Sequence, residues 1–174
     1  MKKNNEGFSI VELVVVIALL SIFLGIFVSN IGVITGYTAK ECYKKISSAI
    51  TANKIETLGK ATTTGDVYLE IYVNSTDKLL YARTVTKGNT ANPEYKNVEK
   101  LAKKNNVKIS YVVKPNPTSS VTNPVSEGHP LKICFNRATG AIESPANLSM
   151  IVVKAGTYTY KIDIVAATGK VKGK

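Results

Sequence analysis

The chain has 174 residues, and its 23 Lys and Arg against 12 Asp and Glu give a formal net charge of +11. This length suits one domain, or one domain joined to an anchor. Two cysteines, one histidine and no CxxC spacing argue against a structural zinc module, a disulfide-rich scaffold and a metalloenzyme. We therefore expect no metal and no cofactor.

The most apolar part of the chain lies near its N-terminus. No charged residue occurs from Leu13 to Ala39, and this run exceeds the ~20 residues that a helix needs to cross a hydrocarbon core. The run is too long for a secretory signal, and it reaches Lys40 without a small-x-small cleavage site. Because Lys2 and Lys3 precede it, the positive-inside rule predicts a cytoplasmic N-terminus and an external domain after the run.

A single carboxylate, Glu12, lies at the cytoplasmic rim of this apolar run. Burying a charge without a partner in lipid costs at least ~2.5 kcal/mol, so such a residue is a functional hypothesis by default. The plain alternative is a glutamate that reaches the headgroups or is protonated.

The residues around Glu12 favour a function. Residues 7–13, GFSIVEL, follow a short basic leader and begin a long apolar helix, and they resemble the class III signal of type IV prepilins and type II secretion pseudopilins. The resemblance implies that prepilin peptidase cuts between Gly7 and Phe8 and that Phe8 is then methylated. It also implies a role in assembly for Glu12, which can neutralise the new α-ammonium group of Phe8 on a neighbouring subunit.

An amphipathic helix is predicted to continue beyond Ala39 and to end near Gly59. Charged residues alternate there with apolar positions at helical spacing: Cys42, Tyr43, Ile46, Ala49, Ile50 and Leu58. This outer half of the helix must bury its apolar stripe in the domain that follows.

From Asp66 onward the apolar period changes to two, which is typical of half-buried antiparallel strands. Strands are predicted at 67–73, 107–113, 131–135, 151–153 and 158–164, with a weaker candidate at 79–85. Hairpin turns are predicted at Thr139-Gly140 and at 155–157. Residues 93–106 predict a short helix, and residues 115–130, which hold four of the six prolines, predict an exposed loop.

The predicted fold class is α+β and pilin-like, with a long N-terminal helix, half transmembrane and half amphipathic, packed on an antiparallel sheet. We expect a prepilin leader at 1–7 and a transmembrane and polymerisation helix at 8–39. The outer helix and a connecting loop follow at 40–65, and an extracellular β-rich head occupies 66–174.

The two cysteines, Cys42 and Cys134, both fall on the predicted external side, where a disulfide could clamp the helix to the sheet. The alternation argues against this bond. Leu131, Ile133 and Phe135 form the expected inward face, so Cys134 should point the other way, and two separate thiols are the alternative.

Positive charge gathers at the C-terminus, where Lys170, Lys172 and Lys174 close the chain. These lysines could attract phosphates, and Gly169-Lys170-Val171-Lys172 resembles the glycine-plus-basic motif of some minor pilins that bind DNA for uptake. The plain alternative is that they keep an external domain soluble or contact an anionic envelope.

Catalysis is disfavoured. His129 lies in the proline-rich segment, no nucleophile is paired with a base at a recognisable spacing, and no glycine-rich phosphate loop follows a strand. We expect no enzyme.

The sequence thus predicts a structural subunit of a type IV pilus, or of a secretion or competence pseudopilus. The expected partners are prepilin peptidase, other pilin subunits, an assembly platform with its ATPase, and the membrane. We expect a single-pass membrane protein before assembly, and a surface filament or envelope pseudopilus after it. Two alternatives stay open: a minor tip pilin that binds DNA, and a monomeric single-pass surface protein whose Gly7-Phe8 bond stays intact.

Overall fold

The structure is a computed structural model that describes residues 9–60, 66–87, 93–116 and 118–173, with the side chains of 27–34, 116 and 173 outside the description. The chain divides into two compact units, Met1–Ile34 and Thr35–Lys174, called here unit 1 and unit 2. One helix, α1 (Ile10–Lys60), contributes to both units. The predicted end of the helix near Gly59 is therefore confirmed.

The described residues of unit 1 are Ser9 and the N-terminal part of α1. Its described large apolar side chains, from Ile10 to Ile26, are between 44% and 82% exposed. Over the part of the chain that the structure describes, no helix combines the length and the hydropathy that crossing a bilayer requires.

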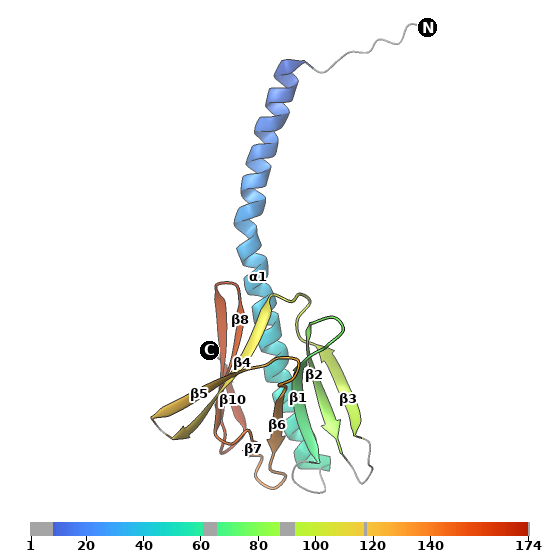
Figure 1. Ribbon diagram of the computed structural model, residues 1–174, viewed down its shortest axis with the longest axis vertical. Coiled ribbons are helices and arrows are strands. Elements are labelled where there is room, and N and C mark those ends of the chain that lie inside the picture. The colour runs from blue at the N-terminus through green and yellow to red at the C-terminus, as the bar shows by residue number, and fades with distance from the viewer. Residues whose placement is uncertain (1–8, 61–65, 88–92, 117, 174) are drawn as a thin grey trace, which may run out of the picture. The chain divides into compact units, whose positions relative to one another are not determined.

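Unit 2 contains two five-stranded antiparallel sheets that flank the C-terminal part of α1 (Figure 1). Sheet A has the strand order β3-β2-β1-β6-β7, and sheet B has the order β10-β9-β8-β4-β5. The strands of sheet A are β1 (Val67–Val73), β2 (Leu80–Thr86), β3 (Glu94–Lys100), β6 (Leu131–Phe135) and β7 (Ile142–Ser144). The strands of sheet B are β4 (Val107–Asn116), β5 (Ser119–Pro124), β8 (Leu148–Ala155), β9 (Tyr158–Val165) and β10 (Lys170–Gly173). The α+β class with a helix packed against antiparallel strands is confirmed, but the strands form two sheets and not the single predicted one.

The helix buries one stripe of side chains in unit 2, with spacings of three and four residues. The stripe consists of Ala39, Cys42, Ile46, Ile50, Asn53 and Thr57. Cys42, Ile46 and Ile50 follow the apolar pattern that the sequence predicts. The C-terminal end differs, because Asn53 and Thr57 continue the stripe while Leu58 is 46% exposed. The Asn53 Nδ2 group donates a hydrogen bond of 3.3 Å to Thr84 Oγ1 of β2.

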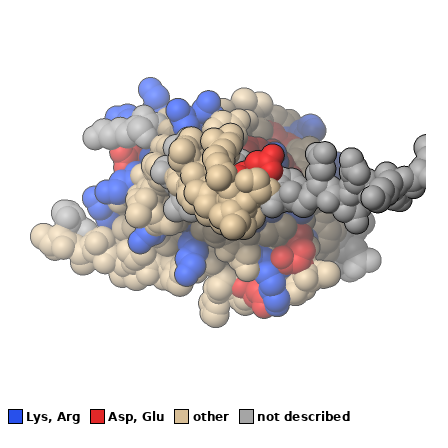
Figure 2. Space-filling view, turned by 90° about the horizontal axis from the view of Figure 1, so that it is seen from above, with Lys and Arg blue, Asp and Glu red and all other residues tan. Residues whose placement is uncertain are grey.

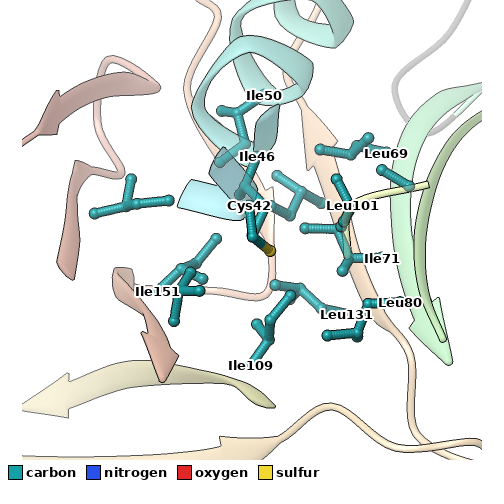
Figure 3. Close-up of a cluster of buried hydrophobic side chains, with 14 of the residues drawn as sticks. Cys42, Ile46, Ile50, Leu69, Ile71, Leu80, Leu101, Ile109, Leu131 and Ile151 are labelled. Carbon is teal, nitrogen blue, oxygen red and sulfur yellow. The ribbon is translucent and has the colours of Figure 1, made fainter. Parts of the chain in front are cut away.

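The core of unit 2 lies between the helix and the inner faces of both sheets (Figure 3). Cys42, Ile46 and Ile50 project from α1 into the cluster. They meet side chains from five strands and a connecting segment: Leu69, Ile71, Leu80, Leu101, Ile109, Leu131 and Ile151. Each of these buried side chains contributes about 1.5–3 kcal/mol of transfer free energy, so the helix is an integral part of the fold.

Polar contacts connect the helix to both sheets. Lys45 forms ion pairs with Glu41, at 3.6 Å, and with Glu99 of β3, at 3.4 Å. On the other side, the Lys54 ammonium group donates a 2.6 Å hydrogen bond to the Thr168 carbonyl, in the turn before β10.

A glycine allows the two sheets to approach each other. Gly169 has a φ of +59°, and a Cβ there would press against the Gly140 carbonyl and the Phe135 ring. Nearby, the Ile142 amide of sheet A donates a 2.7 Å hydrogen bond to the Ala166 carbonyl of the β9–β10 turn. A side chain at position 169 would therefore separate the C-terminal hairpin from sheet A.

The predicted helix at 93–106 is wrong, because residues 94–100 form the edge strand β3. Asn97 has a φ of +51°, and the register with β2 shifts by one residue between Ala82 and Thr84. The extra residue of this bulge interrupts the period of two along the strand. The apolar residues Tyr95 and Val98 are therefore separated by three positions, which is also the spacing expected on one face of a helix. The segment 115–130 also differs from the predicted loop, because it contains the exposed edge strand β5 paired with β4.

The remaining strands follow the sequence pattern. The strands predicted around 67–73, 79–85, 107–113, 131–135, 151–153 and 158–164 all form, several with an extension of a few residues. The turn at 137–139 joins β6 to β7, and Gly156, with a φ of +57°, lies in the β8–β9 turn. Both predicted hairpins are confirmed.

Candidate functional site

The N-terminus of α1 is closed by a capping box between Ser9 and Glu12. The Ser9 amide donates a 3.1 Å hydrogen bond to Glu12 Oε2, and the Val11 amide donates a 3.2 Å hydrogen bond to Ser9 Oγ. The Leu13 amide donates to the Ser9 carbonyl at 3.1 Å. Because the first amides of a helix lack intrahelical acceptors, these contacts satisfy donors that would otherwise be unpaired.

The Glu12 carboxylate is favoured at this position, because the N-terminus of a helix carries a partial positive charge. Among the described residues, no cationic group lies within 4.0 Å of it. Glu12 therefore has one neutral hydrogen-bond donor and can accept further ones. Gly7 and Phe8, which form the predicted cleavage bond, lie outside the described residues.

The surface of α1 that follows Glu12 is apolar on every side. Five successive residues, 13–17, are all at least 44% exposed, and five residues cover more than one helical turn. Ser21 does not interrupt this surface with an unpaired hydroxyl, because its Oγ donates a 2.8 Å hydrogen bond to the Ile17 carbonyl. A helix that is apolar all round needs an apolar environment, supplied by lipid or by other helices.

Both cysteines are free thiols, so the candidate disulfide between Cys42 and Cys134 is not formed. Cys42 is fully buried in the core, and this burial raises its pKa to about 12, although Lys45 nearby acts in the opposite direction. Leu131, Ile133 and Phe135 are all buried, so Cys134 lies on the opposite face of β6, as the alternation predicts. Burial raises the pKa of the Cys134 thiol as well. Neither thiol is poised to act as a nucleophile.

The C-terminal lysines lie on the edge strand β10, where Lys170 and Lys172 are exposed on one face. Lys174 lies outside the described residues. The partly buried Val171 between them points to the core, so alternation along the strand separates the two lysines from it.

His129 is exposed in a turn, and its Nδ1 lies 3.4 Å from Ser126 Oγ. Within the described ranges, no cluster of three His, Cys, Asp or Glu side chains is arranged to hold a metal.

Two of the features described here were missed in the sequence, although signals for both are present. The spacing of Ser9 and Glu12 is the S-x-x-E pattern of a capping box. Asn53 and Thr57 continue the helical spacing of Ile46 and Ile50. A search for apolar periodicity does not detect them, because their side chains are polar.

Comparison with known proteins identifies the N-terminal segment. Residues 2–28 match the family model of the prokaryotic N-terminal methylation motif. This motif is the class III prepilin signal of type IV pilins and pseudopilins, so the resemblance seen in residues 7–13 is confirmed. No curated protein and no solved structure matches the chain. The pilin-like character of the fold of unit 2 stays a prediction.

Proposed function

We propose that the chain is a pilin-like or pseudopilin subunit that is processed at its N-terminus and assembled through its N-terminal helix. The observation that carries this proposal is the methylation motif at residues 2–28, followed by a helix with exposed apolar side chains on every face. In this proposal, prepilin peptidase cuts between Gly7 and Phe8, and Phe8 becomes the methylated N-terminus. The subunit has a structural role and no catalytic one.

Residues 8–39 form the proposed membrane anchor. The support comes from the sequence, which has no charged residue between Leu13 and Ala39, and from the exposure of the apolar residues up to Ile26. Transfer of such a side chain from water to an apolar medium is favourable by about 1.5–3 kcal/mol. In the membrane, lipid covers these side chains. In a filament, the helices of neighbouring subunits replace the lipid, while unit 2 lies outside.

Glu12 has two proposed roles in this sequence of events. Before assembly its carboxylate caps its own helix through the Ser9 amide. The cut at Gly7 creates an α-ammonium group on Phe8, and we propose that the same carboxylate pairs with this group on a neighbouring subunit. Because a charge in an apolar medium is costly without its counter-charge, this pairing favours one axial register between subunits. An assembly platform and its ATPase supply the energy.

A second candidate function is DNA capture by a minor tip subunit. The exposure of Lys170 and Lys172 on β10 supports it, because neither ammonium group has a carboxylate within 4.0 Å among the described residues. A surface pilus, a secretion pseudopilus and a competence pseudopilus all share the N-terminal signal, so the signal does not favour one of them.

The test of the proposal is the N-terminus of the protein purified from membranes that contain prepilin peptidase. We expect an intact mass and an N-terminal sequence that begin at methylated Phe8. Gly7→Ala should leave Met1 in place, because the peptidase needs the glycine before the cut. Gly25→Ala is a matched control, because a Cβ there meets no atom within 4 Å.

The Gly25→Ala protein should be cut like the wild type. An intact Met1 terminus in the wild type would contradict the proposal and would leave a monomeric, membrane-anchored surface protein. Cleavage that continues in the Gly7→Ala protein would place the processing site elsewhere.

A further inference from the structure

All of the net positive charge of the chain belongs to unit 2, whose residues include 21 Lys and Arg and 10 Asp and Glu. Figure 2 shows that the blue side chains gather over the half of unit 2 that contains sheet B, while most of the visible red ones lie over the other half. The pairing register of sheet B identifies the lysines that share one face of this sheet.

The outer face of sheet B carries a row of five lysines that crosses four strands. The row consists of Lys108 on β4, Lys154 on β8, Lys161 on β9, and Lys172 and Lys170 on β10. All five side chains are exposed, because their neighbours along each strand point into the core. We call this set the lysine row.

The register arranges the row as a line. Lys108 is directly opposite Lys154. Lys161 is opposite Val152, two residues from Lys154, and Lys172 is opposite Asp163, two residues from Lys161. With about 4.8 Å between strands and about 6.7 Å per two residues, the row is about 25 Å long. Asp163 of β9 also lies on this face, directly opposite Lys172.

Within the part of the chain that the structure describes, no lysine of the row forms an ion pair. Seven of the eight ion pairs among the described residues involve lysines, and none of these lysines belongs to the row. Asp163 is the only carboxylate in the register of the row, and it forms no ion pair within 4.0 Å. Lys108 and Lys154 face each other directly, and like charges in that arrangement destabilise a sheet. The Lys108–Lys154 pair therefore does not stabilise the sheet.

We propose that the lysine row binds the backbone of double-stranded DNA without regard to sequence. A line of cations matches a linear polyanion better than a planar membrane surface. Duplex DNA has one phosphate per about 3.4 Å of axis on each strand, so a 25 Å row spans about seven phosphates. No aromatic side chain lies in the row to stack on the bases of a single strand. This inference rests on the second candidate function, DNA capture, and extends its site from Lys170 and Lys172 to the whole lysine row. It does not depend on cleavage or filament assembly.

The experiment uses the full chain in neutral detergent and a labelled duplex of arbitrary sequence, with binding followed by fluorescence anisotropy. Five phosphate contacts predict a slope of about −4.5 for log K against log salt, and hence about 500-fold weaker binding at 200 mM than at 50 mM salt. The variant K154Q/K161Q/K172Q keeps two lysines of the row, so its slope should be about −1.8. Its binding should then weaken only about 12-fold between 50 mM and 200 mM salt.

The matched control is K44Q/K103Q/K104Q, which removes the same charge from exposed positions outside the row. It should bind the duplex like the wild type. Equal weakening in the two variants would overturn the proposal and would attribute binding to net charge. Circular dichroism should give the same spectrum for the wild type and both variants. Weaker binding by a variant then cannot be attributed to unfolding.

A second arm replaces the duplex with vesicles of zwitterionic lipid containing an anionic lipid. If K154Q/K161Q/K172Q loses vesicle binding and keeps duplex binding, the row is a membrane contact and the proposal is wrong. Absence of duplex binding by the wild type at about 50 mM salt would also overturn it.

Discussion

At the scale of single residues, Ser9 and Glu12 combine a local role in the helix with a proposed role between subunits. The capping box needs a hydrogen-bond acceptor at position 12, whereas pairing with an α-ammonium group needs a negative charge there. These two requirements can be separated, because a glutamine keeps the acceptor and loses the charge. Ser9 provides the converse case, because its hydroxyl caps the helix and carries no charge.

Glu12→Gln should therefore leave the helix intact and impair assembly. Glutamine is an accepted partner in a capping box, so the helix content measured by circular dichroism should stay that of the wild type. Filament yield, measured by electron microscopy and by the cross-linked oligomer ladder, should fall if charge pairing sets the register. Wild-type filament yield from Glu12→Gln would contradict the proposed role of the charge.

Ser9→Ala is the matched change for the cap. It removes the hydroxyl acceptor of the Val11 amide and should cost about 0.5–2 kcal/mol at the helix terminus, while the charge of Glu12 stays. A filament yield close to that of the wild type is expected.

At the scale of elements, the sequence predicts the elements in which periodicity and burial agree. The stripe at Cys42, Ile46 and Ile50 and the strands around Leu69, Ile133 and Ile162 were predictable, because buried side chains there repeat with the period of the element. β3 was not, because the bulge at Asn97 changes the period within an exposed edge strand. The lysine row was not predictable either, because it depends on the register between four strands.

The stripe on α1 predicts a clear contrast between two leucine-sized side chains. Ile50→Ala removes a fully buried side chain and should lower the free energy of unfolding by about 2–5 kcal/mol, which lowers Tm by about 6–15 °C. Leu58→Ala, at a side chain that is 46% exposed, should change Tm by less than about 3 °C.

Near-ultraviolet circular dichroism of the full chain in detergent measures this contrast, because all nine tyrosines lie in unit 2. Similar melting temperatures for the two variants would mean that α1 does not depend on this stripe for its packing. A large decrease in Tm for Leu58→Ala alone would mean that Leu58 belongs to the buried stripe, as the sequence predicts.

At the scale of the whole molecule, the chain separates two surfaces of opposite character. Unit 1 exposes apolar side chains from Ile10 to Ile26, whereas unit 2 has its own core and holds all of the net charge. The division between the units falls at Ile34 and Thr35, ahead of the first buried residues of the stripe on α1. The part of α1 that completes the core therefore belongs to unit 2.

This division predicts that residues 35–174 fold alone as a soluble monomer, whereas the full chain needs detergent. The fragment retains Ala39, Cys42, Ile46 and Ile50, and it lacks the exposed apolar residues of unit 1. Size-exclusion chromatography with light scattering should give one monomeric species without detergent, with the near-ultraviolet spectrum of the full chain. A fragment that starts at Thr51 is the control, because it lacks those four core residues and should not reach that spectrum. Aggregation of the 35–174 fragment would mean that unit 1 is needed to complete the fold, and a folded 51–174 fragment would mean that the sheets form their core without the helix.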